Sequence, residues 1–370
     1  MRRALLLAIG LTFVFSAQAV AADSASEGNG DNVFMTTVSA SDYHSVVKTS
    51  KGDVWYWGGI ADVIDGKHTF RDNVPWLVKD LKDAVDIKSS RQNEVILKKD
   101  GTVWEWGPEY ELYSSENHDG KTLFPSPKQV KGLSEIVKIS AGGIASAIDK
   151  EGSVWVWLPD RYFSGPRKLE NVTDAQEISA NGIGEIHILR KNGTVWKWSG
   201  YAEMKANEKY VASEVKGLKE IVALSSGNGK QTFAIKKDGS VWGWGANIGG
   251  IFYSPVTEET EKIEVPVRLS SLKNVSSIVT GMYGALVLKK DGTLWILGYD
   301  IGADGRLIDR GTEPRRMEGL NKVVSAAGGY YHFVAVTEDG KVWTWGSNAA
   351  GQLGDGSFKG STTPIAIKLK

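Results

Sequence analysis

A short motif recurs seven times along this chain of 370 residues. Each copy has a glycine, a small or polar residue, valine or leucine, tryptophan, any residue, and then an aromatic or apolar residue. The copies begin at Gly52, Gly101, Gly152, Gly193, Gly239, Gly292 and Gly340. Self-similarity at a period of about 20 to 50 residues is typical of solenoids and propellers. The repeat therefore limits the chain to folds built from one repeated unit.

The sequence of each copy predicts a β-hairpin. Large and variable residues alternate in segments such as Val241-Trp242-Gly243-Trp244, which is the period of a strand with one packed face. Most copies follow a turn such as Lys237-Asp238-Gly239, whose residues tolerate the positive φ of a tight hairpin. A short alternating strand is thus expected before the turn, as at 232–236, antiparallel to the tryptophan strand.

Two further strands complete each predicted unit. Segments such as 137–143 and 323–329 are β-rich and end in very small residues, which suit a crowded ring axis. Proline-containing segments such as 314–317 follow the variable loops, and proline favours an outer edge strand. We therefore predict an all-β, seven-bladed propeller of four-stranded antiparallel blades, because blade-on-blade packing buries both faces of each sheet. We expect the C-terminal strand, 364–369, to close the ring by pairing in the first blade.

The last copy carries a specific family resemblance. Residues 327–354 contain Ala327-Gly328-Gly329, His332, the 338–348 turn and tryptophan strand, and Gly351-Gln352-Leu353-Gly354. This segment resembles a regulator of chromosome condensation repeat, and the other six copies keep its turn and strands but lack the Gly-Gln-Leu-Gly tail. The resemblance implies the same propeller fold, of the secreted bacterial type. Propellers of the WD type usually have a shorter period and a Gly-His with Trp-Asp pair, which this chain lacks.

The N-terminus predicts export. Residues 1–21 combine Arg2 and Arg3, an apolar run and small residues at the end, as in a secretory signal peptide of the Sec type. Twin-arginine export is the less favoured alternative. We expect residues 22–32 to be a short flexible linker and residues 33–370 to form one propeller domain, secreted to the extracellular space.

Composition narrows the possible functions. The 44 basic and 44 acidic residues balance, so nothing in the charge favours nucleic acid. No later segment approaches a membrane span, and we expect no membrane insertion. The chain has no cysteine, which excludes disulfides, thiolate metal sites and cysteine nucleophiles. Hydrolase and nucleotide-binding motifs are also missing. We therefore expect a monomer that is not an enzyme and needs no cofactor or metal.

Aromatic residues mark a candidate binding face. The turns between the first and second strands and the variable loops after the tryptophan strands should emerge on the same face, and loops on rigid scaffolds commonly carry function. Tyrosine-rich loops suit protein recognition, although any one ring could instead cover a blade edge. The candidate residues of this face are Tyr43, His44, Tyr110, Tyr113, Tyr162, Phe163, Phe252, Tyr253, Tyr283, Tyr330, Tyr331 and His332.

Two of these candidates are histidines at one repeat position. His44 and His332 lie eight residues before the turn glycines of the first and last copies, which become neighbours when the ring closes. One alternative for this pair is a metal site, because histidine is the commonest metal ligand. Histidine here also belongs to the repeat consensus of the family, which favours a structural role. The paired tryptophans likewise favour an interblade core over a sugar-stacking or light-sensing cluster.

We expect a binding propeller that recognises an extracellular or cell-envelope protein through this face. One alternative is an inhibitor of a secreted enzyme such as a β-lactamase. A second is a polysaccharide-active hydrolase or lyase, which would need carboxylates near His44 and His332 at a separation that glycosidase chemistry uses. By analogy of fold, the resemblance also suggests guanine-nucleotide exchange, but export from the cytoplasm argues against that activity.

Overall fold

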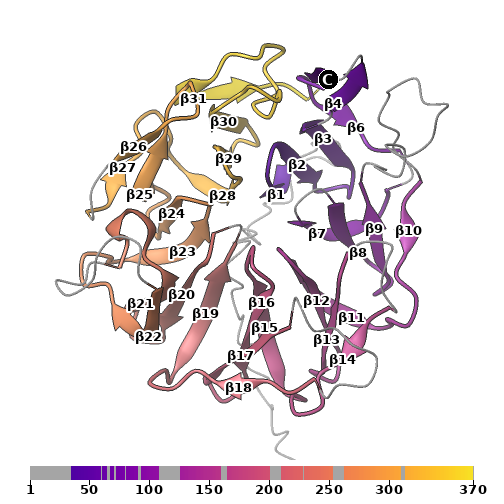
Figure 1. The fold of residues 1–370 in the computed structure, drawn as a ribbon, viewed down its shortest axis with the longest axis vertical. Coiled ribbons are helices and arrows are strands. Elements are labelled where there is room, and N and C mark those ends of the chain that lie inside the picture. Colours follow the sequence, from indigo (N-terminus) through magenta and orange to yellow (C-terminus); the bar gives the residue numbers. More distant parts are fainter. Residues whose placement is uncertain are drawn as a thin grey trace, which may run out of the picture.

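A computed structural model describes residues 35–59, 61–64, 67–70, 72–79, 81–90, 93–107, 126–159, 165–200, 210–227, 229–252, 262–309 and 313–369. The seven sheets stand around a central axis like the blades of a propeller (Figure 1). Each blade has four antiparallel strands, and the sixth gains a fifth. The predicted fold class is confirmed.

The strands of the blades have these bounds. The first blade contains β1 (Met35–Ala40), β2 (His44–Thr49), β3 (Val54–Gly58) and β6 (Trp76–Leu77). The second contains β7 (Ala84–Ser90), β8 (Asn93–Lys98), β9 (Val103–Trp106) and β10 (Lys128–Gln129). The third contains β11 (Ile136–Ala141), β12 (Ala145–Asp149), β13 (Val154–Trp157) and β14 (Arg167–Lys168). The fourth contains β15 (Ala175–Ala180), β16 (Glu185–Arg190), β17 (Val195–Ser199) and β18 (Ser213–Glu214).

The remaining blades follow the same order. The fifth contains β19 (Ile221–Ser226), β20 (Gln231–Lys236), β21 (Val241–Ala246) and β22 (Lys262–Arg268). The sixth contains β23 (Val275–Thr280), β24 (Gly284–Lys289), β25 (Leu294–Ile301), β26 (Leu307–Asp309) and β27 (Arg315–Arg316). The seventh contains β28 (Val323–Gly328), β29 (His332–Thr337), β30 (Val342–Gly346) and β31 (Ser361–Ile367). A hairpin of β4 (Ala61–Ile64) and β5 (Lys67–Phe70) and a 3-10 helix, η2 (Ile248–Gly250), lie in the loops.

The turns between the second and third strands have the predicted conformation. All seven motif glycines adopt positive φ, for example +77° at Gly101 and +80° at Gly239. An L side chain rarely adopts this region, so glycine relieves strain at the turn. The first strand of every blade then carries a register shift near its start, such as the one between Val323 and Ser325. A bulge of this kind increases local twist, which suits wedge-shaped blades around an axis.

The tryptophan strands form the interblade core. The second tryptophan of the motif is buried, with Trp57 and Trp345 fully inaccessible. The first tryptophan is half-buried. In the second to sixth blades a basic side chain lies over its ring; Lys289 Nζ, for example, lies 3.7 Å from the Trp295 ring centre. Each apolar cluster joins residues of two neighbouring blades. This supports the prediction that the tryptophans pack the core.

The predicted closure of the ring is wrong in one respect. The C-terminal strand β31 pairs with β30, so it completes the seventh blade, and β6 is the outer strand of the first blade. The chain enters each blade at its innermost strand, and each outer strand follows its own tryptophan strand. Each repeat of the sequence therefore coincides with one blade, and none of the described strands is exchanged between the first and last blades.

Side-chain packing and one loop join the first and seventh blades instead. Val38 and Val47 of the first blade pack with Val334 and Ile367 of the seventh. The loop 347–360 also reaches the first blade, because Trp57 Nε1 donates a hydrogen bond to the Gln352 carbonyl at 2.9 Å. Among the described residues, no helix has the length and apolar character to span a membrane.

Candidate protein-binding face

The turns between the first and second strands of the blades lie side by side around one end of the central axis. We call the space along this axis the channel and this end its mouth. Backbone hydrogen bonds join neighbouring turns, including Gly143 N to Asn181 O at 2.8 Å and Met282 N to Gly329 O at 3.3 Å. A Cβ atom at Gly142 would lie 2.5 Å from the Asn181 carbonyl oxygen. This close approach explains why the first strands end in very small residues, and it holds the turns in a fixed arrangement.

Four tyrosines from three adjacent turns gather at this mouth. Tyr43 comes from the first blade, Tyr283 from the sixth, and Tyr330 and Tyr331 from the seventh. The ring of Tyr331 lies 6.3 Å from Tyr43, 5.7 Å from Tyr283 and 6.3 Å from Tyr330, measured between ring centres. We call these four residues the tyrosine cluster. Ring closure thus brings together residues nearly 300 positions apart.

The tyrosine cluster is partly exposed to solvent. Tyr43 is 44% exposed, and the other three side chains are intermediate. The hydroxyl groups of Tyr283 and Tyr331 lie 3.5 Å apart. This hydrogen bond, with burial, raises the pKa of Tyr283 to about 12, so Tyr283 is uncharged at neutral pH. Rigid aromatic rings with polar tips are enriched at protein interfaces.

The two histidines lie beneath the tyrosine cluster and bridge blades. His44 Nε2 is 2.6 Å from Oε1 of the buried Glu94 in the second blade, and His332 Nε2 is 2.8 Å from the Ser45 hydroxyl of the first blade. The predicted proximity of the two histidines is supported, since His332 bonds the residue next to His44. Each histidine occupies the first position of a second strand and reaches the second position in the next blade.

This geometry favours the structural role of the histidines. Burial, followed by the influence of His44, lowers the pKa of His332 to about 3, so His332 is neutral at neutral pH. Within the part of the chain that the structure describes, no three histidine, aspartate or glutamate side chains are grouped to hold a metal ion. The imidazole rings of His44 and His332 are buried, so they stabilise the turns of this face and do not offer area for contact with a partner.

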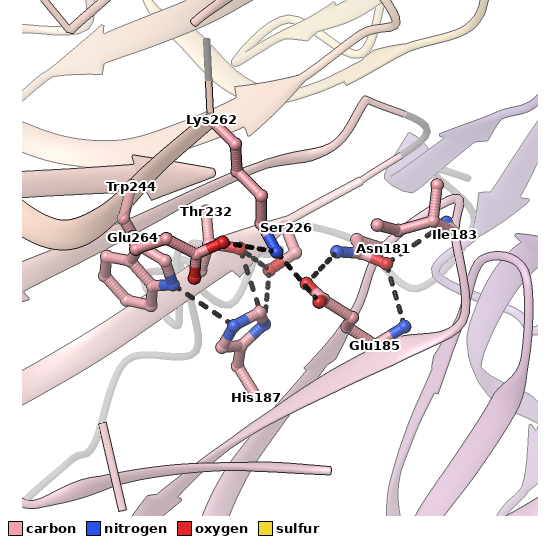
Figure 2. Close-up of polar contacts among 9 residues, drawn as sticks. All are labelled: Asn181, Ile183, Glu185, His187, Ser226, Thr232, Trp244, Lys262 and Glu264. Carbon is pink, nitrogen blue, oxygen red and sulfur yellow. Dashed lines mark hydrogen bonds and ion pairs between the residues drawn. The ribbon is translucent and has the colours of Figure 1, made fainter. Parts of the chain in front are cut away.

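A polar network occupies the same face on the fourth and fifth blades (Figure 2). Asn181 accepts hydrogen bonds from the backbone of Ile183 and Glu185 at 3.1 and 2.9 Å, and its amide donates to Glu185 Oε2. Lys262 Nζ from β22 lies 3.6 Å from Glu185 and 3.1 Å from Glu264. Sequence reasoning missed this network, although Glu185 occupies the repeat position of His44.

His187, two residues after Glu185 in β16, connects the fourth blade to the fifth. Trp244 Nε1 donates to His187 Nε2 at 3.2 Å, so that nitrogen must accept (Figure 2). The proton of the neutral ring is therefore on Nδ1, which faces the hydroxyls of Ser226 and Thr232. Burial lowers the pKa of His187 to about 4.

The other predicted residues of the face divide into two groups. Phe252 is fully buried, with its ring 5.5 Å from that of Phe233, because the small Gly243 leaves room for it in the core. Its predicted role as an exposed contact is therefore wrong. The remaining candidates lie outside the described residues: Tyr110, Tyr113, Tyr162, Phe163 and Tyr253.

Comparisons with known proteins agree with the fold. The model of the regulator of chromosome condensation repeat matches residues 323–352 and 339–370. The mitochondrial RCC1 domain-containing protein RUG3 of Arabidopsis thaliana is 29% identical over 55% of this chain and 52% of its own length. Protein pim1 of Schizosaccharomyces pombe is 25% identical over 61% of this chain and 49% of its own length. The chain thus spans about half the length of these curated relatives.

A solved structure gives the same architecture. The crystal structure of human WBSCR16 aligns with a TM-score of 0.66 over 86% of this chain and 95% of that one, at 19% sequence identity. A guanine nucleotide exchange factor of Saccharomyces cerevisiae, SRM1, is also similar, at 23% identity over 69% of this chain and 66% of its own length. At these identities the structural likeness concerns the fold.

Proposed function

Because this chain is a propeller of regulator of chromosome condensation-like repeats, we propose that it binds another protein through the face that carries the tyrosine cluster. One observation supports this most directly: four tyrosines from three blades converge on adjacent turns, two of which are joined by a backbone hydrogen bond from Met282 N to the Gly329 carbonyl. A preorganised aromatic patch loses little conformational entropy on binding. The predicted leader at 1–21 favours an extracellular or cell-envelope partner.

The test is capture with matched surface variants. The purified chain, immobilised through its C-terminus, should retain a specific protein from culture supernatant or a cell-wall extract. Changing Tyr43 and Tyr331 together to serine should reduce capture of that protein at least tenfold, because both rings lose their contact area. Val222→Ser is the control, since Val222 is 40% exposed at the opposite end of the channel. Equal capture by both variants would contradict the proposal.

Inhibition of a secreted enzyme such as a β-lactamase is a special case of this proposal. It requires that the captured protein be an enzyme and that its activity fall when the chain is added. The variant with serine at Tyr43 and Tyr331 should then lose inhibition in parallel with capture.

Guanine-nucleotide exchange is the second candidate, because the similar SRM1 of Saccharomyces cerevisiae is named as an exchange factor. It would require a partner in the cytoplasm and so conflicts with the predicted leader. Accelerated release of labelled nucleotide from a small GTPase would favour it over extracellular binding.

A polysaccharide hydrolase or lyase gains no support from the geometry of the mouth. Glu94, the carboxylate that contacts His44, is fully buried and engaged with both His44 and Ser89. The pocket at the axis beneath the turns has a volume of only about 40 Å³ and is lined mainly by serine, alanine, glycine and valine. A sugar ring would not reach Glu94 there.

A further inference from the structure

The far end of the channel holds a larger cavity, of about 470 Å³. It lies where the first strands begin, opposite the tyrosine cluster, and the exposed Val85 and Val137 stand at its rim. The first four blades provide most of its wall, through β1, β7, β11 and β15. Its volume falls within the range of small-molecule pockets. Two lysines in this wall break the pattern of the repeat.

Lys48 replaces an apolar core residue. Lys48 pairs with Val54, the valine of the motif, across the hairpin of the first blade. Its equivalent in the second blade is Leu97, which pairs with Val103. In the other six blades this position is always buried and apolar: Leu97, Ile148, Leu189, Ile235, Leu288 and Val336. Lys48 is only 7% exposed. A buried ammonium group destabilises the fold unless charge compensates it, so packing does not explain this lysine.

Lys88 replaces a small residue beside the axis. The equivalent residues of the other first strands are Ser39, Ser140, Ser179, Ser225, Val279 and Ala327. Lys88 is also 7% exposed, and its Nζ lies 2.9 Å from Asp86 Oδ1. Asp86 therefore compensates one lysine, while two lysines share this corner of the cavity.

The charges of the cavity leave a positive excess. Three lysines, Lys48, Lys88 and Lys138, face two carboxylates, Asp86 and Glu177. Among the described residues, the hydrogen-bond acceptor of the Lys48 ammonium is the Thr49 carbonyl, at 3.2 Å. Burial is the main cause that lowers the pKa of Lys48, and Asp86 and Lys88 act on it in opposite directions. An anion in the cavity would supply the missing compensation.

Hydroxyl oxygens line the same wall and can accept hydrogen bonds from the hydroxyl groups of a ligand. Thr36, Thr37, Ser50 and Ser179 all border the cavity. We propose that the cavity binds a small hydroxylated organic anion that carries one carboxylate or phosphate group, with Lys48 and Lys88 as its charge partners. The site is independent of the protein-binding face, because it opens at the other end of the channel.

Isothermal titration calorimetry with defined probes tests this site. The probes are gluconate as the carboxylate, glucose 6-phosphate as the phosphate, and glucose as the matched neutral compound. At least one anion should bind ten times more tightly than glucose. Both anions would be bound by the same ammonium groups. Their relative affinities therefore show whether the site prefers a carboxylate or a phosphate.

Variants that restore the residue of the other repeats provide the control for folding. Lys48→Leu and Lys88→Ser should each weaken binding of the anion at least tenfold, and Lys48→Leu should melt at an equal or higher temperature than the wild type. Lys341→Ala, which alters an exposed turn lysine, should bind as the wild type does. The proposal is overturned if neither anion binds at millimolar concentration, or if both cavity variants bind as tightly as the wild type.

Discussion

A buried neutral histidine makes the stability of this propeller depend on pH. His187 has a pKa of about 4 in the folded chain and an ordinary value near 6.5 when unfolded. The unfolded chain therefore binds the proton more readily, and stability that is present above pH 6.5 is lost as the pH falls toward 4. The change attributable to His187 is about 3 kcal/mol.

Urea unfolding of the wild type and of His187→Gln at several pH values between 7.5 and 4 measures this effect. Glutamine can still accept the hydrogen bond from Trp244 but does not titrate. The free energy of unfolding should fall less steeply with decreasing pH in the variant. Parallel slopes would show that His187 does not carry the proton linkage. His332 adds to the slope in both proteins with the same sign.

Single residues were predictable where the repeat gave them a position. The neighbourhood of His44 and His332 followed from their shared place in the first and last copies. The burial of Phe252 did not, because it depends on the space left by Gly243 and Phe233 in the fold. Lys48 and Lys88 are visible in the sequence only when all seven copies are aligned on the hairpin register.

At the scale of elements, the loop 347–360 should stabilise the ring more than an ordinary turn does. Gly354 and Gly239 both have positive φ, at +69° and +80°. A Cβ at Gly354 would lie 2.7 Å from the Trp57 ring of the first blade, whereas a Cβ at Gly239 would meet nothing within 4 Å. Backbone strain is thus similar at both sites, and only Gly354 adds a steric clash.

Thermal unfolding of Gly354→Ala and Gly239→Ala separates these contributions. Gly239→Ala should cost about 1 kcal/mol, from strain alone. Gly354→Ala should cost at least about 2 kcal/mol, because Trp57 is fully buried and cannot move away freely. Equal losses would show that the close approach of Gly354 to Trp57 does not add to the cost of the substitution.

Most elements could be predicted because the same hairpin appears seven times. The motif located the second and third strands, and small residues or prolines located the others. The hairpin of β4 and β5 and the extra strand β26 were not predicted, since each occurs once and lacks the motif. Elements outside the repeat have no second copy with which to compare them.

At the scale of the whole molecule, every blade is a continuous piece of chain. A circular permutant should therefore fold: residues 80–369, which keep the buried Leu81, followed by a linker of about six residues and then residues 35–79. The linker would join the outer strand of the seventh blade to the inner strand of the first blade, as native segments do at the other junctions. We expect a melting temperature within about 5 °C of the wild type, because all blade contacts persist.

Circular dichroism and calorimetry of the permutant measure this outcome. The same permutant without residues 361–369 is the control, because it removes the outer strand of the seventh blade. Failure of the complete permutant to fold would contradict the view that blades are contiguous units. The C-terminal strand was wrongly predicted to pair in the first blade, because a proline-containing strand at the C-terminus is compatible with pairing in either blade.

The junction of the first and seventh blades has a mechanical consequence. At the other six junctions the polypeptide itself passes from blade to blade. Here the described residues that resist separation act through packing, the stacking of Tyr43 on Tyr331, the His332 contact with Ser45 and the loop around Gln352. Tension applied to the two chain ends would load this junction first. The molecule should then yield by opening into an arc before any single sheet unravels.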